Sequence, residues 1–271
     1  MKKLLVAVLT FATLNMFAAD IDLWKNSTLN KILQSGELRV GMEPGYMPFE
    51  MKDKKGNIIG YDVDMARKMA KDMGVKLTLV PTSWDGIIAG LITDKFDIIM
   101  SGMTITQERN LQINFANPYI VVGQTVMMDK KLADTIKTAK DLDKPEYTIV
   151  TKLGVTGEIA TKKFFKNAKI VTFETEADAA AEVLNGKAAA MVYDQPYNVL
   201  FMSDKGKDRL VHLDTPLTYE PLGWALRKGD PDFLNWLNNF LRQSQEDKVV
   251  GFSDELYQKW LVETDWLQRV Q

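Results

Sequence analysis

Hydrophobic and polar positions follow a repeating order in the first half of the chain. Short apolar runs predict strands over residues 38–41, 76–80 and 96–100. Between them, apolar residues recur at helical spacing over residues 62–73 and 84–92. We expect Asp62 to cap the first of these helices and Gly74 to end it. Strands alternating with helices predict an α/β unit with a mostly parallel sheet.

The same order returns in the second half of the chain. Apolar runs predict strands over residues 147–151, 169–173 and 188–193. Helical spacing follows each of them, over residues 156–165, 176–184 and 195–202. Two such series predict two α/β lobes within the 271 residues. Two further helices are expected over residues 232–243 and 253–261.

The N-terminal residues have the pattern of a cleaved signal peptide. Lys2 and Lys3 precede an apolar run over residues 4–14, and the small residues Ala18 and Ala19 follow. A membrane-spanning helix needs about 20 apolar residues, so this run is too short. We expect residues 1–19 to be removed. The chain contains no cysteine, which excludes a lipid-modified cysteine anchor, disulfides and thiolate metal sites. The predicted location is the periplasm, without a lipid anchor.

Composition narrows the classes of function. The formal net charge of −2 argues against nucleic-acid binding, which calls for a basic surface. The single histidine, His212, argues against a histidine zinc site and against a Ser/His/Asp triad. His212 lies in the short apolar run 210–213, where a structural role is expected. We expect no metal, no cofactor and a monomer.

One turn carries the clearest chemistry. The predicted strand over residues 96–100 runs directly into Ser101, Gly102, Met103 and Thr104, and Arg109 follows. Such a turn can present backbone N–H groups, a hydroxyl and a guanidinium to one point, which suits a carboxylate. A solvated Arg109 on a surface helix is the alternative for an isolated arginine.

This turn and five other segments resemble the periplasmic amino-acid-binding proteins of ABC importers, solute-binding protein family 3, of the lysine/arginine/ornithine-binding type. The segments occur in family order over residues 41–49, 60–64, 84–86, 101–109, 154–158 and 192–194. The resemblance implies an α/β fold of the type II periplasmic-binding-protein class, in which two mostly parallel sheets are joined by a two-strand hinge. It also implies two partners, a free L-amino acid and the membrane permease of an ABC importer.

Two extended runs, over residues 123–128 and 223–227, flank the second series. In the family, two such crossings form the hinge and the C-terminal helices return to the first lobe. We therefore place lobe one at residues 20–123 and 224–271, lobe two at 128–219, and the hinge at 124–127 and 220–223. Ligands of open α/β sheets bind at the carboxyl ends of the strands, so the ligand is expected between the lobes.

The resemblance also assigns site residues. Arg109 is expected to grip the α-carboxylate of the ligand, helped by Thr104, the backbone of Gly102 and the N-terminus of the helix that Thr156 begins. Asp194 is expected to accept hydrogen bonds from the α-ammonium; a helix cap is its alternative. The rings of Tyr46 and Trp84 are expected to sandwich the side chain of the ligand, although both rings are also compatible with an ordinary core. The predicted substrate-binding set is Glu43, Tyr46, Trp84, Ser101, Gly102, Met103, Thr104, Arg109, Thr156 and Asp194.

Glu43 points to the class of ligand. If Arg109 and Asp194 neutralise the two backbone charges of an amino acid, Glu43 and Asp85 remain without a partner. An unpaired and partly desolvated carboxylate is costly, so a cationic side chain fits best: lysine first, then ornithine or arginine. A Glu43 that faces solvent is the alternative. Asp62 and Asp64 are expected to be structural, at the N-terminus of their helix.

A second class of function uses the same fold. Cyclohexadienyl dehydratases, which act on prephenate or arogenate, resemble this chain in the Trp84 region and in a glutamate at Glu158, the position of their general acid. Their substrates carry an extra ring carboxylate, which Glu43 and Asp85 would repel. The prediction is therefore a binding protein rather than an enzyme, with the dehydratase as the alternative.

Overall fold

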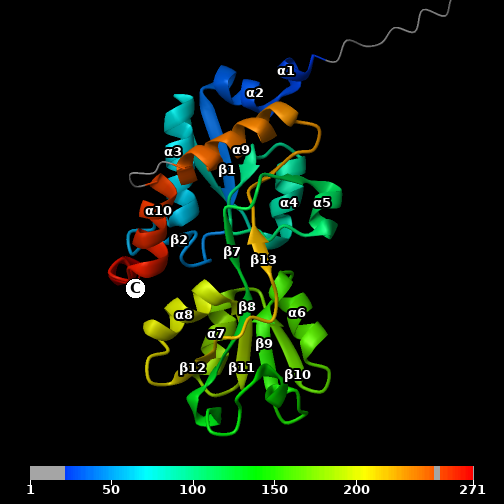
Figure 1. Cartoon of the computed structure of the whole chain (residues 1–271), viewed down its shortest axis with the longest axis vertical. Coiled ribbons are helices and arrows are strands. Elements are labelled where there is room, and N and C mark those ends of the chain that lie inside the picture. The colour runs from blue at the N-terminus through cyan, green and yellow to red at the C-terminus, as the bar shows by residue number, and fades with distance from the viewer. Residues whose placement is uncertain (1–21, 247–250, 271) are drawn as a thin grey trace, which may run out of the picture.

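The structure, a computed structural model, describes residues 22–246 and 251–270. Two lobes lie one above the other and are joined by extended segments (Figure 1). The predicted signal peptide lies outside the described residues. Within the described part of the chain, none of the helices has the length and apolar character needed to span a membrane.

The first sheet contains the strands of the first predicted series. Its order is β4 (Lys76–Pro81), β1 (Glu37–Met42), β5 (Ile98–Ile99), β14 (Ala225–Leu226) and β6 (Asn114–Phe115). β1 lies parallel to both β4 and β5, whereas β14 runs antiparallel to β5 and β6. β14 comes from the far end of the chain, so two distant segments build this sheet.

The second sheet repeats this arrangement. Its order is β10 (Lys169–Phe173), β9 (Thr148–Lys152), β11 (Ala190–Asp194), β8 (Gln124–Asp129) and β12 (Leu210–Leu213). β9 lies parallel to β10 and β11, and β8 runs antiparallel to β11 and β12. The predicted fold class, with two mostly parallel sheets, is therefore confirmed.

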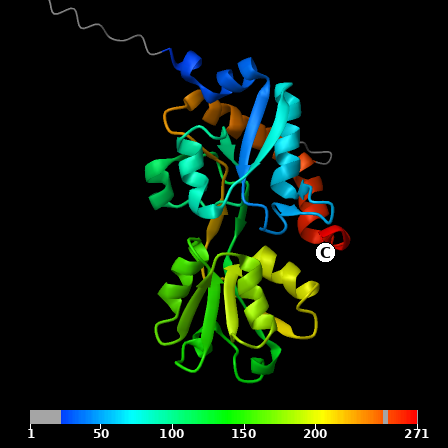
Figure 2. The ribbon, with the colours of Figure 1, turned by 180° about the vertical axis from the view of Figure 1, so that it is seen from behind.

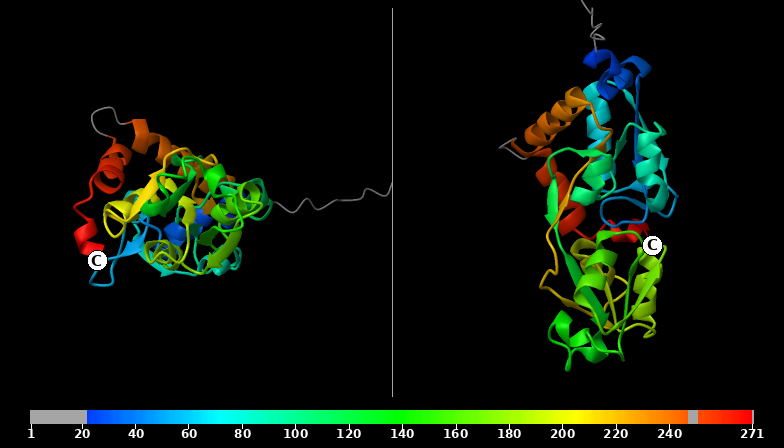
Figure 3. Two further views of the ribbon diagram at one scale, coloured as in Figure 1. Left: turned by 90° about the horizontal axis from the view of Figure 1, so that it is seen from below. Right: turned by 90° about the vertical axis from the view of Figure 1, so that its right-hand side faces the viewer.

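Two antiparallel strands connect the lobes, β7 (Ile120–Val122) and β13 (Glu220–Leu222). They lie side by side between the lobes (Figure 1, and Figure 3, right). Residues 124–127, predicted as one crossing, lie in β8 within the second sheet. The lobe boundaries and the hinge motion remain predictions.

Helices cover the faces of both sheets (Figures 1 and 2). In lobe two, α6 and α7 contact β9 and β11, and α8 contacts β8 and β12. In lobe one, α3 and α4 contact β1, while α9 contacts α2 and α10 contacts α3. The helices are α1 (Leu23–Asn26), α2 (Thr28–Ser35), α3 (Tyr61–Met73), α4 (Trp84–Ile92), α5 (Gln107–Gln112), α6 (Thr156–Phe164), α7 (Glu176–Leu184), α8 (Gln195–Ser203), α9 (Pro231–Glu246), α10 (Phe252–Tyr257) and α11 (Leu267–Val270). Short elements complete the fold: the antiparallel pair β2 (Met51–Lys52) and β3 (Ile58–Ile59), the 3-10 turns η1 (Lys130–Leu132) and η2 (Ala139–Leu142), and the π-helical η3 (Gln258–Val262).

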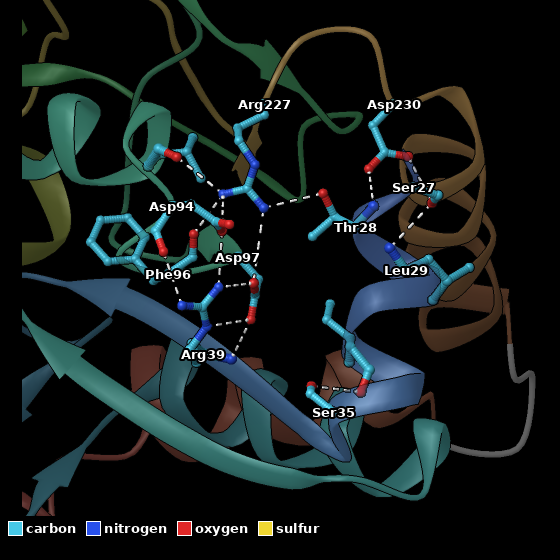
Figure 4. A network of polar contacts seen from close by, with 12 residues as sticks. Ser27, Thr28, Leu29, Ser35, Arg39, Asp94, Phe96, Asp97, Arg227 and Asp230 are labelled. Carbon is cyan, nitrogen blue, oxygen red and sulfur yellow. Dashed lines mark hydrogen bonds and ion pairs between the residues drawn. The ribbon is translucent and has the colours of Figure 1, made fainter. Parts of the chain in front are cut away.

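A polar network ties the chain segments of lobe one together (Figure 4). Arg39 in β1 pairs at 2.6 Å with Asp97, the residue before β5. Arg227 donates to the carbonyl oxygens of Leu91 at 3.0 Å and Phe96 at 2.7 Å, and to the Thr28 hydroxyl of α2. These contacts fix the returning C-terminal segment to the N-terminal half of the lobe.

Asp62 does not cap its helix. α3 begins at Tyr61 with Gly60 in the N-cap position, and no side chain caps it. The buried Asp62 carboxylate instead accepts from the Gly102 N–H at 2.9 Å, the Tyr119 hydroxyl at 3.0 Å and the Trp224 indole at 3.1 Å. Burial raises the pKa of Asp62 to about 6, although these three donors oppose the shift. Asp62 therefore stabilises the turn at Gly102 by accepting the hydrogen bond from its backbone N–H.

Candidate functional site

A cavity of about 340 Å³ lies where the two lobes meet, counting the space at its mouth. Residues after β1 and β5 line it from lobe one, and residues at the ends of β9 and β11 line it from lobe two. This is the place expected for a ligand of open α/β sheets, at the carboxyl ends of the strands. The lining residues are Glu43, Tyr46, Glu50, Trp84, Ser101, Gly102, Thr104, Arg109, Lys152, Val155, Thr156, Tyr193 and Asp194.

Direct contacts join the lobes around this cavity. The Trp84 indole N–H of lobe one donates to the Gly154 carbonyl of lobe two at 2.9 Å. The Thr104 and Thr156 hydroxyl oxygens lie 3.4 Å apart. The structure therefore shows the cleft in a closed arrangement.

Arg109 marks one end of the cavity. It lies on α5, whose N-cap Thr106 accepts from the Arg109 N–H at 3.1 Å. One Nη group donates to the Thr104 carbonyl at 2.9 Å, and the guanidinium lies 5.2 Å from the centroid of the Trp84 ring. These contacts fix the plane of a donor group that matches a carboxylate. Arg109 is partly buried and lines the cavity, which favours the predicted role over a fully solvated surface arginine.

Asp194 lies on the opposite lobe, at the end of β11. Although Asp194 occupies the N-cap position of α8, its side chain makes no capping hydrogen bond. Its carboxylate accepts from the Tyr46 hydroxyl and from the Gln124 amide. Burial raises its pKa to about 7, while the Tyr46 hydrogen bond opposes the shift. Each carboxylate oxygen has two lone pairs, so Asp194 keeps accepting capacity for an ammonium group.

The turn between β5 and α5 uses some of its groups internally. The Gly102 N–H is engaged by Asp62, so it is not available for a ligand carboxylate, contrary to the sequence-based expectation. Met103 is buried in the core of lobe one, and the set of cavity-lining residues does not include it. The Ser101 hydroxyl accepts from the Glu43 N–H at 3.0 Å and donates to Glu50 at 2.7 Å. Ser101 therefore shapes the lining of the cavity.

Gly102 is required because the Tyr46 ring lies against it. Gly102 has a φ of +53°, and a Cβ at this position would lie 2.2 Å from Cε1 of Tyr46. Only glycine combines this backbone conformation with so close an approach. The Tyr46 ring also packs against Phe49, at 4.8 Å between centroids, and against Tyr193 of lobe two at 5.7 Å. Tyr46 thus forms a wall of the cavity.

The far end of the cavity is charged. The Lys152 ammonium, at the end of β9, contacts Glu43 of lobe one and lies 2.8 Å from Glu176 of lobe two. The expectation that Glu43 lacks a partner is therefore wrong, and so is the alternative that it faces solvent, because its side chain is only 21% exposed. Burial raises the pKa of Glu43, although Lys152 opposes the shift. We call Glu43, Glu176 and Lys152 the distal subsite.

Two further details define the distal subsite. A Cβ at Gly45 would lie 2.5 Å from Oε1 of Glu176, so glycine allows this side chain to approach the loop of lobe one. Glu50 is fully buried, and burial together with the nearby Asp62 raises its pKa well above the usual range. Among the described residues, Oε2 of Glu50 has no hydrogen-bond partner. Glu50 lines the cavity, but this oxygen is itself buried, so it faces the protein interior.

Three other residues that the sequence analysis named are Thr156, Asp85 and Glu158. Thr156 lines the cavity and begins α6, as predicted. Asp85 lines a neighbouring depression together with Gly154. Glu158 accepts from the Gly154 N–H at 2.7 Å and pairs with Lys162 at 2.5 Å. It is absent from the lining of the cavity. Burial acts to raise its pKa, but Lys162 and the Gly154 N–H together outweigh burial, so the pKa of Glu158 is lowered.

The structure thus brings nine of the ten predicted residues to one cavity, and Met103 lies outside it. Sequence reasoning missed Lys152, Glu176 and Glu50. Lys152 ends β9 and Glu176 closely follows β10, so the rule that ligands lie at carboxyl ends of strands provided a signal for both.

Among the described residues, no cluster of three or more His, Cys, Asp or Glu side chains is arranged to hold a metal ion.

Comparison with known proteins gives consistent matches over nearly the whole described chain. The family of bacterial extracellular solute-binding proteins, family 3, matches residues 38–263. A protein of Wolinella succinogenes, described as a binding component of an ABC transporter and solved in complex with lysine, is 66% identical. Its TM-score is 0.83, and the match covers 86% of this chain and 99% of that one.

Two curated relatives are more distant. The L-cystine-binding protein TcyJ of Escherichia coli K12 is 30% identical over 232 residues, covering 86% of this chain and 85% of the relative. The cyclohexadienyl dehydratase of Pseudomonas aeruginosa is 30% identical over 237 residues, covering 88% and 87%. The family match spans both sheets and every residue that lines the cavity. The chain is therefore a member of the bacterial extracellular solute-binding proteins, family 3.

Proposed function

We propose that this protein binds an L-amino acid with a cationic side chain between its two lobes and delivers it to the permease of an ABC importer. Lysine is the first choice, followed by ornithine and arginine. The observation that carries the proposal is the distribution of charge along the cavity. Arg109 and Asp194 provide one charge of each sign at one end, and the distal subsite carries a formal charge of −1 at the other.

An α-amino acid matches the first end. The α-carboxylate is held by the Arg109 guanidinium, and the α-ammonium by the Asp194 carboxylate from the opposite lobe. The Thr104 and Thr156 hydroxyls, 3.4 Å apart, lie where both lobes reach the same group. Because these groups come from both lobes, the ligand favours the closed arrangement by contacting both sides at once.

A cationic side chain matches the second end. Glu43 and Glu176 share a single ammonium, that of Lys152, so one negative charge is left over. A side chain that ends in an ammonium or guanidinium group neutralises this charge, and a desolvated charge is costly without such a partner. The lysine complex of the Wolinella succinogenes protein supports the same choice.

The geometry around Glu158 favours binding over a dehydratase reaction. A general acid must hold its proton near neutral pH and reach the leaving group. Glu158 has a lowered pKa, pairs with Lys162, and is not among the residues that line the cavity. Incubation with prephenate should therefore yield no phenylpyruvate beyond the uncatalysed rate, and enzyme-dependent formation of phenylpyruvate would support the dehydratase.

A titration panel tests the proposed ligand. The mature protein is unfolded in denaturant and refolded, which removes any amino acid carried through purification, and is then titrated calorimetrically with lysine, ornithine, arginine, glutamine, leucine and glutamate. We expect the three cationic amino acids to bind most tightly. Tight binding of glutamate or leucine without binding of lysine contradicts the proposal.

Uptake of labelled lysine by cells with and without this protein tests delivery to a permease.

A further inference from the structure

Lys152 is a buried cation inside a cavity that we propose to bind another cation. Its side chain is 2% exposed, and it ends β9 of lobe two. The ammonium contacts one carboxylate from each lobe, Glu43 and Glu176, and lies 6.0 Å from the centroid of the Trp84 ring. A buried lysine in direct contact with the ligand site is part of the recognition chemistry, whether it attracts or repels a given ligand.

Closure of the cleft brings the two carboxylates to the same ammonium. Without a cation between them, Glu43 and Glu176 would be desolvated close to each other, which opposes closure. Lys152 satisfies both carboxylates and leaves a formal charge of −1. The charge that remains, rather than the carboxylates alone, determines which side chain the subsite accepts.

We propose that Lys152 is a specificity-determining residue. The two carboxylates of the distal subsite are neutralised by two positive charges. The Lys152 ammonium supplies one of them, so the ligand supplies only one. This inference rests on the proposed function. A ligand with one terminal cation makes the subsite neutral, a neutral side chain leaves it at −1, and an acidic side chain raises the excess to −2. The preference for lysine over its neutral analogue norleucine should therefore follow the net charge of the subsite.

Two substitutions change that charge in opposite directions. Lys152→Met keeps an unbranched side chain, one heavy atom shorter, and makes the subsite −2, so the ratio of the norleucine Kd to the lysine Kd should rise by about tenfold or more. Glu176→Gln makes the subsite neutral, so the same ratio should fall by about tenfold or more. The double variant restores −1, and its ratio should return to within about threefold of the wild type.

The experiment measures both dissociation constants by displacement calorimetry for the wild type and the three variants, each first shown to unfold cooperatively on heating. Lys152→Arg, which keeps the charge, should keep the ratio of the wild type. If Lys152 is purely structural, all variants should weaken the binding of lysine and norleucine by the same factor. The inference is overturned if the ratio of the two dissociation constants does not shift, or shifts in the same direction in both single variants. If the wild type itself does not prefer lysine, the proposed function fails and the inference fails with it; if only the variant series fails, the proposed function stands.

Discussion

The two ends of the cavity present their charged groups in different arrangements. At the first end, Arg109 and Asp194 belong to different lobes and do not pair with each other, so each can meet one charge of an amino acid. At the distal end, Glu43, Glu176 and Lys152 already pair among themselves. Under the proposed function, recognition at the first end depends on single groups, whereas at the distal end it depends on the charge left after internal pairing.

The two ends also differ in how well the sequence predicts them. Arg109 and Asp194 follow apolar strands in recognisable segments, and the strand ends place them at the cavity. Glu43 was identified, but its partner Lys152 lies 109 positions away. A single sequence does not show which side chains meet across a cleft, so the pairing was missed.

The fold follows the same division between local and distant information. The predicted helices over 84–92 and 176–184 and the strand over 169–173 match the structure residue by residue, because apolar spacing and end signals are local. The expected cap at Asp62 is wrong, since its carboxylate is engaged by groups that distant segments bring to it, Gly102 and Trp224. The N-terminal helix α2 was not predicted, although Ser27 caps it and Gly36 ends it in a left-handed conformation.

The largest effect should come from removing the acidic group of the first end. Asp194→Ala removes the proposed partner of the α-ammonium and leaves the Tyr46 hydroxyl and the Gln124 amide without their acceptor. Truncating one partner of a buried charge pair costs about 2–5 kcal/mol, so lysine should bind roughly thirtyfold or more weakly. The exposed Asp134 of the same lobe provides the control, Asp134→Ala. Equal calorimetric affinities of the two variants would exclude Asp194 from ammonium binding.

Replacing the cation of the first end should have a smaller effect. Arg109→Lys keeps the charge but loses the planar fork and the bond to the Thr104 carbonyl. The affinity for lysine should fall by about tenfold or more. Arg242→Lys, at an exposed position of α9, is the matched control. An Arg109→Lys affinity within a factor of two of the wild type would mean that another group anchors the carboxylate.

The pKa of Asp194, raised to about 7, predicts a pH dependence that originates at the first end. The α-ammonium favours the ionised carboxylate, so a protein with Asp194 protonated must release a proton to bind. Binding should therefore weaken as the pH falls through 7, by about tenfold between pH 8 and pH 6. Protonation of Glu43, whose pKa is also raised by burial, acts in the same direction. Proton release is measured by titration in buffers of different ionisation enthalpy, and an affinity that is flat over this range contradicts the assignment.

The smallest expected change is in the shape of the molecule. Because the two ends together engage both lobes, lysine should shift the population toward the closed arrangement, with bending in the two connecting strands, β7 and β13. Small-angle scattering should give a slightly smaller radius of gyration with saturating lysine than without it. Asp194→Ala should reduce this difference, and a scattering profile that lysine leaves unchanged would contradict closure by ligand binding.

The orientation of the bound ligand tests the central claim most directly. A crystal structure of the refolded protein with lysine should show the α-carboxylate on Arg109, the α-ammonium on Asp194 and the ε-ammonium beside Glu43. A lysine bound in the reverse direction, with its terminal ammonium at Asp194, or bound outside the cleft, would contradict the assignment of the two ends.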